Sequence, residues 1–83
     1  MELPADTILD ELRAQLRRNG RPDDVTGDTK LEAIGYRSID LSELALHVEE
    51  RLGRELNFSA AGVRRLERVD DVVAFLQEAA SAA

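Results

Sequence analysis

Apolar residues recur three and four positions apart in three separate segments of this chain, and no segment shows the strict alternation typical of a β-strand. Side chains with that spacing lie on one face of an α-helix. The pattern therefore predicts an all-α fold in which three apolar stripes meet. The core side chains that we expect are Leu12, Leu16, Leu44, Val48, Val72 and Leu76.

Breaker residues set the expected helix boundaries. Pro4 suits the first turn of the first helix, and Asn19-Gly20 is a stop signal. The second helix should run over residues 38–52 and end at Gly53, because glycine readily adopts the left-handed conformation of a C-cap.

Two further segments complete the expected fold. A short helix over residues 60–65 should follow Ser59, and a last helix should begin near Asp70. Residues 21–37 form a long polar connection that carries a few apolar residues, so this loop should lie on the body of the protein. We expect a small antiparallel four-helix bundle of three longer helices and one short one, with the long loop between the first two, forming a single domain over residues 1–83.

Length and charge restrict the function. A chain of 83 residues has room for one small core, and without cysteine it has neither disulfides nor thiolate metal ligands. The net charge of −6 disfavours nucleic acid and anionic lipid and favours basic protein partners. The first residues lack the pattern of a signal peptide, and no segment is long enough to cross a bilayer. We therefore expect a cytoplasmic monomer that binds neither nucleic acid nor membranes.

Residues arranged for catalysis are not evident. His47 is the only histidine and should lie about three turns along the helix from Ser38, so it cannot serve as a base for that serine. No second ligand accompanies His47 to mark a metal site. We therefore expect neither a catalytic centre nor a bound metal, and we expect that the protein is not an enzyme.

Ser38 is the candidate functional residue, because it follows the glycine-containing turn 34–37 and begins an acidic amphipathic helix. Serine is also among the commonest helix caps, so Ser38 could serve only to cap this helix. The helical wheel places Ile39, Glu43, Leu46 and Glu50 opposite the core face. Two apolar residues among acids on an exposed face favour a surface that docks a partner.

Taken together, these residues resemble the acyl carrier protein family over nearly the whole chain. A glycine three residues before the serine and an acidic amphipathic helix after it belong to the family's pattern, and 56–58 with 69–76 resemble its ending. The tripeptide 34–36 is similar to that of carriers of aromatic polyketide synthases. The matching positions around the serine are Gly35, Ser38, Ile39, Asp40, Glu43, Leu46, Glu49 and Glu50.

The resemblance implies that Ser38 receives a 4′-phosphopantetheine group from coenzyme A through a separate phosphopantetheinyl transferase. The chain would then carry acyl groups as thioesters in polyketide, fatty acid or antibiotic biosynthesis, and it would dock synthases or acyltransferases that have basic patches. An aminoacyl or peptidyl carrier is a close variant. The alternative from another class is an unmodified helical adaptor that binds a basic partner. The docking residues implied are Arg37, Ile39, Asp40, Glu43, Leu46, Glu49 and Glu50.

Arg37 departs from the family pattern, which usually has aspartate immediately before the serine. A cation here also opposes the helix dipole, although an exposed charge changes the free energy by only about 0.3 to 1 kcal/mol. Pairing of Arg37 with Asp40 would compensate. Three consequences are open: poor modification by general transferases, a dedicated transferase or partner with an acidic patch, or a domain that is never modified.

Overall fold

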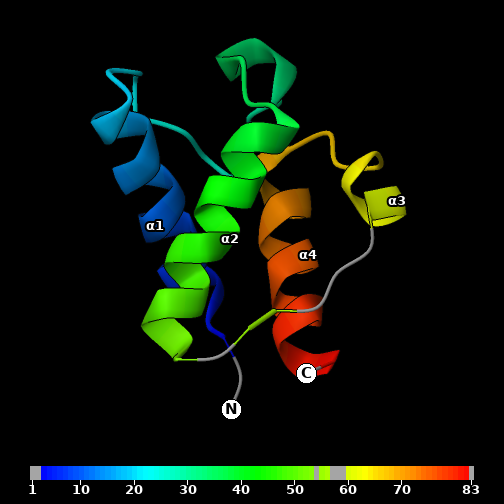
Figure 1. Ribbon diagram of the computed structural model, residues 1–83. Helices are drawn as coiled ribbons and strands as arrows, with labels where there is room; N and C mark the ends of the chain where they lie inside the picture. Colours follow the sequence, from blue (N-terminus) through cyan, green and yellow to red (C-terminus); the bar gives the residue numbers. More distant parts are fainter. Residues whose placement is uncertain (1–2, 54, 57–59, 83) are drawn as a thin grey trace.

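A computed structural model describes residues 3–53, 55–56 and 60–82 of the chain (Figure 1). Within these residues it is all-helical and contains three long helices and no strand. Helix α1 spans Ala5–Arg18, α2 spans Ser38–Leu52 and α4 spans Val69–Ala82. A 3-10 turn, η1, lies at Glu32–Ile34, and a short helix, α3, at Ala60–Val63. The all-α fold predicted from periodicity is confirmed.

Helix boundaries follow the local signals in the sequence. Pro4 is the N-cap of α1, and Asn19 is its C-cap, directly before a left-handed Gly20. Helix α2 begins at Ser38 and ends at Gly53, whose φ of 73° is left-handed. Helix α4 begins at Val69, one residue before the predicted start. Glycine accepts these positive φ values without the clash that a Cβ atom would cause.

Helix α1 packs against both α2 and α4. Figure 1 shows α2 and α4 running in the same direction, with α1 antiparallel to both. The prediction of an antiparallel arrangement therefore holds for α1 against its two neighbours and is wrong for α2 and α4. The chain returns through the segment that carries α3 before α4 starts, so both helices begin at the same end of the molecule (Figure 1).

The core is formed by the three predicted stripes. All six predicted core side chains are at most 1% exposed, and the long loop adds Val25 and Leu31, which are also buried. Each large apolar side chain buried in this way contributes about 1.5 to 3 kcal/mol relative to exposure. Packing of α1, α2 and α4 therefore fixes where the first turn of α2 lies.

The short helix differs from its prediction. Helix α3 ends at Val63 instead of residue 65, and Arg64 and Arg65 lie in a turn that follows it. Gly62 inside the segment disfavours a longer helix, because glycine loses more backbone entropy than other residues. Ser59, the expected cap, lies outside the described residues. The four-helix bundle stays a prediction, since α1 packs against α2 and α4 while α3 is a single turn.

The long connection between α1 and α2 is attached to the start of α4 by main-chain hydrogen bonds. The Leu31 N–H donates to the Glu67 carbonyl oxygen, and the Val69 N–H donates to the Thr29 carbonyl oxygen, each at 2.9 Å. Lys30 and Arg68 form an isolated antiparallel bridge between these bonds. The loop thus lies on the body of the protein, as its apolar residues predicted, and it forms one side of the region around Ser38.

No described helix combines the length and the hydrophobicity that a membrane span needs.

Candidate functional site

Ser38 is the first residue of α2 and its side chain is exposed. The left-handed Gly35 ends η1, and Arg37 follows in an extended conformation as the N-cap of α2. Ser38 therefore stands one position inside the helix, and among the described residues its hydroxyl has no hydrogen-bond partner. Capping does not account for this serine, and its hydroxyl is free to react.

Other serines differ from Ser38 in their surroundings. The Ser42 hydroxyl, one turn along α2, donates to the Ser38 carbonyl oxygen at 3.2 Å. Ser81 lies in the last turns of α4, far along the chain from the loop that precedes α2. Ser59 lies outside the described residues. Only Ser38 among the described serines combines an exposed hydroxyl with a place at a helix N-terminus.

Asp40 stabilises the first turn of α2 from the core side, instead of belonging to an exposed docking surface as predicted. Its side chain was predicted to belong to the docking surface, but the residue is only 7% exposed. Its Oδ2 atom accepts the Arg37 main-chain N–H at 2.8 Å, which is one half of a capping box. An arginine side chain has no acceptor, so the other half cannot form. Asp40 therefore holds the turn that presents Ser38.

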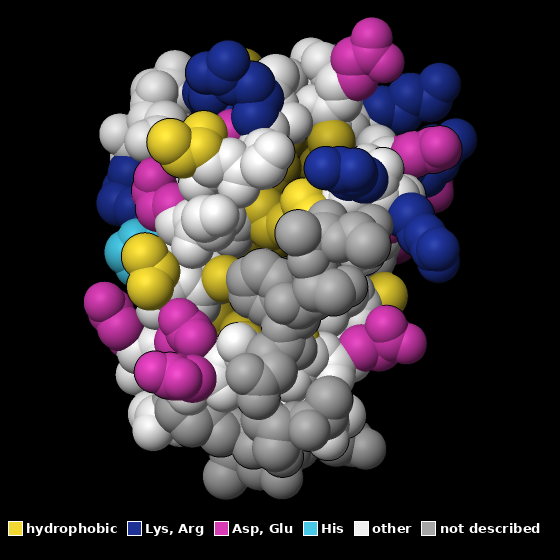
Figure 2. All heavy atoms as spheres, turned by 45° about the vertical axis from the view of Figure 1, so that its right-hand side comes forward, with side chains coloured by type: hydrophobic (Ala, Val, Ile, Leu, Met, Phe, Trp, Pro, Cys, Tyr) yellow, Lys and Arg dark blue, Asp and Glu magenta, His cyan; other side chains and the backbone are white. Residues whose placement is uncertain are grey.

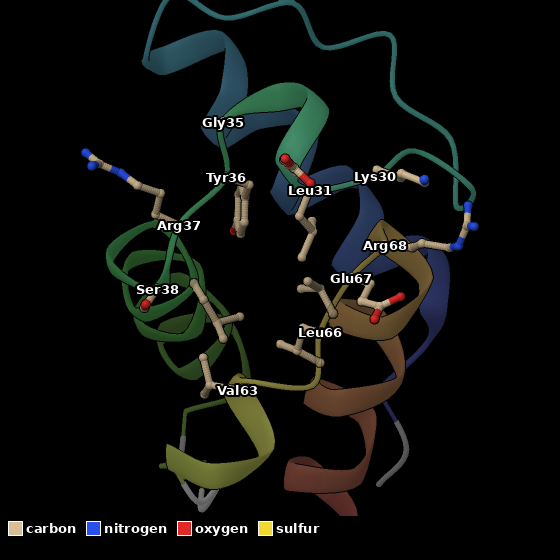
Figure 3. A pocket seen from close by; sticks show the side chains of 13 residues that line it. Lys30, Leu31, Gly35, Tyr36, Arg37, Ser38, Val63, Leu66, Glu67 and Arg68 are labelled. Carbon is tan, nitrogen blue, oxygen red and sulfur yellow. The ribbon is translucent and has the colours of Figure 1, made fainter.

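Arg21 makes the ion pair that was expected of Arg37. The Arg21 Nη1 atom lies 3.3 Å from the Asp40 Oδ2 atom, and it also donates to the Gly35 carbonyl oxygen at 3.4 Å. Arg37 is exposed and its guanidinium has no ion pair among the described residues. Figure 3 shows the Arg37 side chain extending away from the molecule beside Ser38. The Arg37 cation is thus available to a partner.

A buried polar network supports the same turn from below. Gln15 on α1 is fully buried, and its Nε2 atom donates to the Asp40 carbonyl oxygen at 2.7 Å. The Tyr36 hydroxyl donates to the Gln15 Oε1 atom at 2.7 Å and lies 3.3 Å from the same Asp40 carbonyl oxygen. Burial, reinforced by the nearby negative charges of Asp40 and Glu43, raises the pKa of Tyr36 well above its ordinary value of 10.0. The neutral phenol therefore remains a donor.

Sequence reasoning missed Gln15 and Tyr36. The signal for Gln15 was its position seven residues after Ile8 and three after Leu12, which places it on the core stripe of α1. A polar residue on such a stripe needs a buried partner, because an unpaired amide in the interior costs about 1 to 3 kcal/mol. The partner could not be identified, since Tyr36 is 21 residues away in the chain.

A pocket of about 730 Å³ opens beside Ser38 (Figure 3). Ser38 and Arg37 lie at one edge, and the long loop, α3 and the start of α4 complete the wall. Figure 3 shows Leu31, Tyr36, Val63 and Leu66 around the open space, whereas Arg37, Lys30 and Arg68 extend away from it. The apolar side chains that line the pocket are Leu31, Tyr36, Leu41, Val63, Leu66 and Val72. The pocket can therefore take an apolar group that enters from the side of Ser38.

The exposed face of α2 carries the predicted apolar residues. Ile39 is 70% exposed and Leu46 is 60% exposed, and they are the large hydrophobic residues that remain exposed among the described ones. Glu50 is exposed between turns of the same helix, and Glu43 is half-exposed, with its Oε1 atom 3.9 Å from the Arg18 Nη2 atom. We call Ile39, Glu43, Leu46 and Glu50 the α2 ridge. Figure 2 shows such hydrophobic side chains separated by acidic ones down one side of the molecule.

Glu49 has a structural role beside the ridge. Its Oε2 atom accepts the Leu56 main-chain N–H at 2.8 Å, directly after α2 ends. This bond commits one carboxylate oxygen to the following segment, so Glu49 is a weaker docking candidate than was predicted. His47 is half-exposed on the same helix. Among the described residues there is no group of three or more acidic, histidine or cysteine side chains that could hold a metal ion.

Three comparisons bear on the identity of this site. No protein-family model, no curated protein and no solved structure matches the chain.

Proposed function

We propose that this protein is a stand-alone acyl carrier protein that bears 4′-phosphopantetheine on Ser38. The observation that carries this is exposed Ser38 at the N-terminus of α2 and at the edge of an apolar pocket, with a hydroxyl that bonds to none of the described residues. The carrier would act in polyketide, fatty acid or antibiotic biosynthesis, as a cytoplasmic monomer and not as an enzyme. The short helix α3 would be the fourth member of the bundle.

The residues around Ser38 fit a phosphodiester on its Oγ atom. The first main-chain N–H groups of a helix lack intrahelical acceptors, and the dipole of α2 favours negative charge at that end. Arg37 adds an exposed cation on the residue next to Ser38. The arm when bound supplies a thiol for acyl thioesters. Its cargo would have the apolar pocket beside Ser38 as a shelter.

The attachment requires a separate phosphopantetheinyl transferase. The Ser38 Oγ atom would form a new P–O bond to the phosphopantetheine phosphate of coenzyme A. The pyrophosphate P–O bond would break, adenosine 3′,5′-bisphosphate would leave, and the hydroxyl proton would pass to a base of the transferase. Serine is weakly nucleophilic unless a base or metal activates it, so this chain would be a substrate and not a catalyst.

Modification can be tested on the intact protein. The wild type, incubated with coenzyme A and a broad-specificity transferase, should gain the mass of one phosphopantetheine. Ser38→Ala should gain none, and Ser42→Ala, one turn along α2, should gain the same mass as the wild type. Circular dichroism confirms that each variant is folded. If several transferases, including one encoded nearby, leave the wild-type mass unchanged, the carrier proposal is wrong.

Arg37→Asp extends the same experiment. It restores the charge that is usual in the family at an exposed position that forms no ion pair among the described residues. General transferases should modify this variant faster than the wild type. Equal rates would show that Arg37 does not affect recognition by the transferase. This result would leave Ser38 as the attachment point.

Docking through the α2 ridge gives a second test. Leu46→Ala and Glu50→Lys should each raise the transferase KM for the carrier about tenfold, because a central interface contact contributes on the order of 1 to 2 kcal/mol. Their kcat should be unchanged. Glu78→Lys makes the same charge change as Glu50→Lys, at an exposed position on α4, and it serves as the control. If the ridge variants keep the KM of this control, the ridge is not the docking surface.

The adaptor alternative rests on the same ridge. Ile39 and Leu46 expose apolar surface among acids whether or not Ser38 is modified. An unmodified adaptor would bind a basic partner through α2 without coenzyme A. An aminoacyl or peptidyl carrier differs from an acyl carrier only in cargo. Modification of Ser38 would therefore support both kinds of carrier and exclude the adaptor.

A further inference from the structure

Among the described residues, the cations that form no ion pair gather near one pocket. The described arginines on α1, in the loop that follows it and at the end of α2 have partners. Arg13 donates to the Val25 carbonyl oxygen. Each of the others pairs with a carboxylate: Arg17, Arg18, Arg21 and Arg51. The remaining described cations form no ion pair: Lys30, Arg37, Arg64, Arg65 and Arg68. We call these five residues the basic rim.

The basic rim surrounds the pocket described above. Lys30, Arg37 and Arg68 line it, and Arg64 and Arg65 follow Val63, which also lines it. All five cations are exposed. The Arg68 guanidinium donates to the Asp28 main-chain oxygen at 3.0 Å, and the Arg68 main-chain N–H donates to the Asp71 Oδ2 atom at 2.9 Å. Figure 2 shows Lys and Arg side chains beside a hollow with a hydrophobic floor, with some acidic side chains among them and a further acidic group on the opposite side of this face.

Cations exceed acids around the hollow. Three cations of the basic rim, Lys30, Arg37 and Arg68, line it, against two carboxylates, Glu32 and Glu67. This local excess occurs in a chain with a net charge of −6. The α2 ridge has the opposite character, because Glu43 and Glu50 flank its apolar residues. The molecule thus presents two apolar surfaces with opposite charges.

The shape of the rim indicates the size of its ligand. In Figure 3 Arg37 points to one side of the pocket, and Lys30 and Arg68 point to the other. Cations that diverge in this way cannot converge on one small anion, but they can contact carboxylates spread along a polypeptide. The apolar floor between them would accept one apolar side chain. Interfaces commonly combine such an apolar centre with a charged rim.

We propose that the basic rim and its pocket bind an acidic segment of a partner protein, independently of the α2 ridge, with one apolar side chain of that segment in the pocket. Charge complementarity favours carboxylates on the partner, and the apolar floor favours a polypeptide over a nucleic acid, because a polypeptide can supply an apolar side chain. The opposite charges of the two surfaces would direct two classes of partner to two sites. The binding requires no modification of Ser38, and an acyl cargo sheltered in the same pocket would compete with it.

Titration of the unmodified, isotope-labelled protein with a synthetic helical peptide tests this inference. The probe carries glutamates on both sides of a single leucine, and its matched control carries lysines in place of the glutamates. The acidic peptide should shift the amide resonances of residues 30, 37 and 64–68, and added salt should weaken its binding because exposed charges are screened. The lysine peptide should not shift these resonances.

Charge-reversed variants locate the binding. Arg64→Glu with Arg65→Glu should weaken binding of the acidic peptide about tenfold, which corresponds to about 1.4 kcal/mol. Arg17→Glu with Arg18→Glu makes the same change in net charge on α1, where both arginines are ion-paired, and should have little effect. Amide spectra of both variants show that they are folded.

Several results would overturn the inference. The inference is wrong if both charge reversals weaken binding equally, or if the lysine peptide binds at the rim. It is also wrong if the acidic peptide shifts no resonances at residues 30, 37 and 64–68, or if a single-stranded oligonucleotide binds more tightly than the acidic peptide. The transferase plays no part in this experiment, so its outcome and that of the Ser38 experiment are separate.

Discussion

Leu44→Ala should lower the free energy of unfolding by about 2 to 5 kcal/mol. Leu44 is fully buried on α2, and the substitution leaves a cavity between that helix and its neighbours. A chain of 83 residues has a total stability of roughly 4 to 12 kcal/mol, so this loss is a large fraction of it. Urea unfolding followed by circular dichroism measures the difference.

Leu46→Ala is the matched control for Leu44→Ala, because it makes the same chemical change two residues further along the same helix. Leu46 is 60% exposed, so its truncation should change the free energy of unfolding by no more than about 0.5 kcal/mol. If the two substitutions cost the same, the assignment of the core and solvent faces of α2 is wrong. A stable Leu46→Ala protein also ensures that a loss of docking in this variant is not a loss of fold.

Gln15→Leu and Tyr36→Phe should each lower the free energy of unfolding by about 1 to 3 kcal/mol, because each removes a hydrogen bond from a buried polar atom of the network. The double variant should cost less than the sum of the two by about 0.5 to 1.5 kcal/mol, since the two groups are bonded to each other at 2.7 Å. Denaturant unfolding of the four proteins in the cycle gives this coupling energy. Hydrogen exchange of the Leu41 amide, which donates to the Arg37 carbonyl oxygen at 3.1 Å, should become faster in both single variants.

Gln77→Leu supplies the control for the cycle. Gln77 lies on α4 and donates to the Leu3 carbonyl oxygen at 3.1 Å, whereas the Tyr36 hydroxyl bonds to Gln15 and Asp40. Its effect should add to that of Tyr36→Phe within about 0.5 kcal/mol. If Gln15→Leu and Tyr36→Phe are equally additive, the network does not act as a unit and does not hold the turn that precedes Ser38.

Local signals predicted the helices because those signals act within a few residues. Pro4, Gly20 and Gly53 lie at the observed ends of helices for steric reasons that need no distant contact. The exposure of Ile39 and Leu46 was also predictable, since the helical repeat turns them away from a face that Leu44 and Val48 already occupy. These features follow from the geometry of one helix.

The same reasoning failed for charged and polar residues at the start of α2. The resemblance put Asp40 among the docking residues, and a pairing with Arg37 was considered for it. Burial of Asp40 and its pairing with Arg21 depend instead on where the loop passes. The direction of α4 relative to α2 was also missed, because it depends on the path of the segment that returns the chain to the start of α4 (Figure 1).

The sequence by itself determined the three helical stripes, their ends and the placement of Ser38 where a glycine turn meets an acidic helix. Periodicity and steric preference act locally, so these features needed no knowledge of the fold. Only the tertiary structure decided that Gln15, Tyr36 and Arg21 converge on Asp40 and that a pocket opens beside Ser38. Except for the contact between Tyr36 and Asp40, these contacts join residues that are 14 or more positions apart in the chain. They therefore depend on how the loop and the helices pack together.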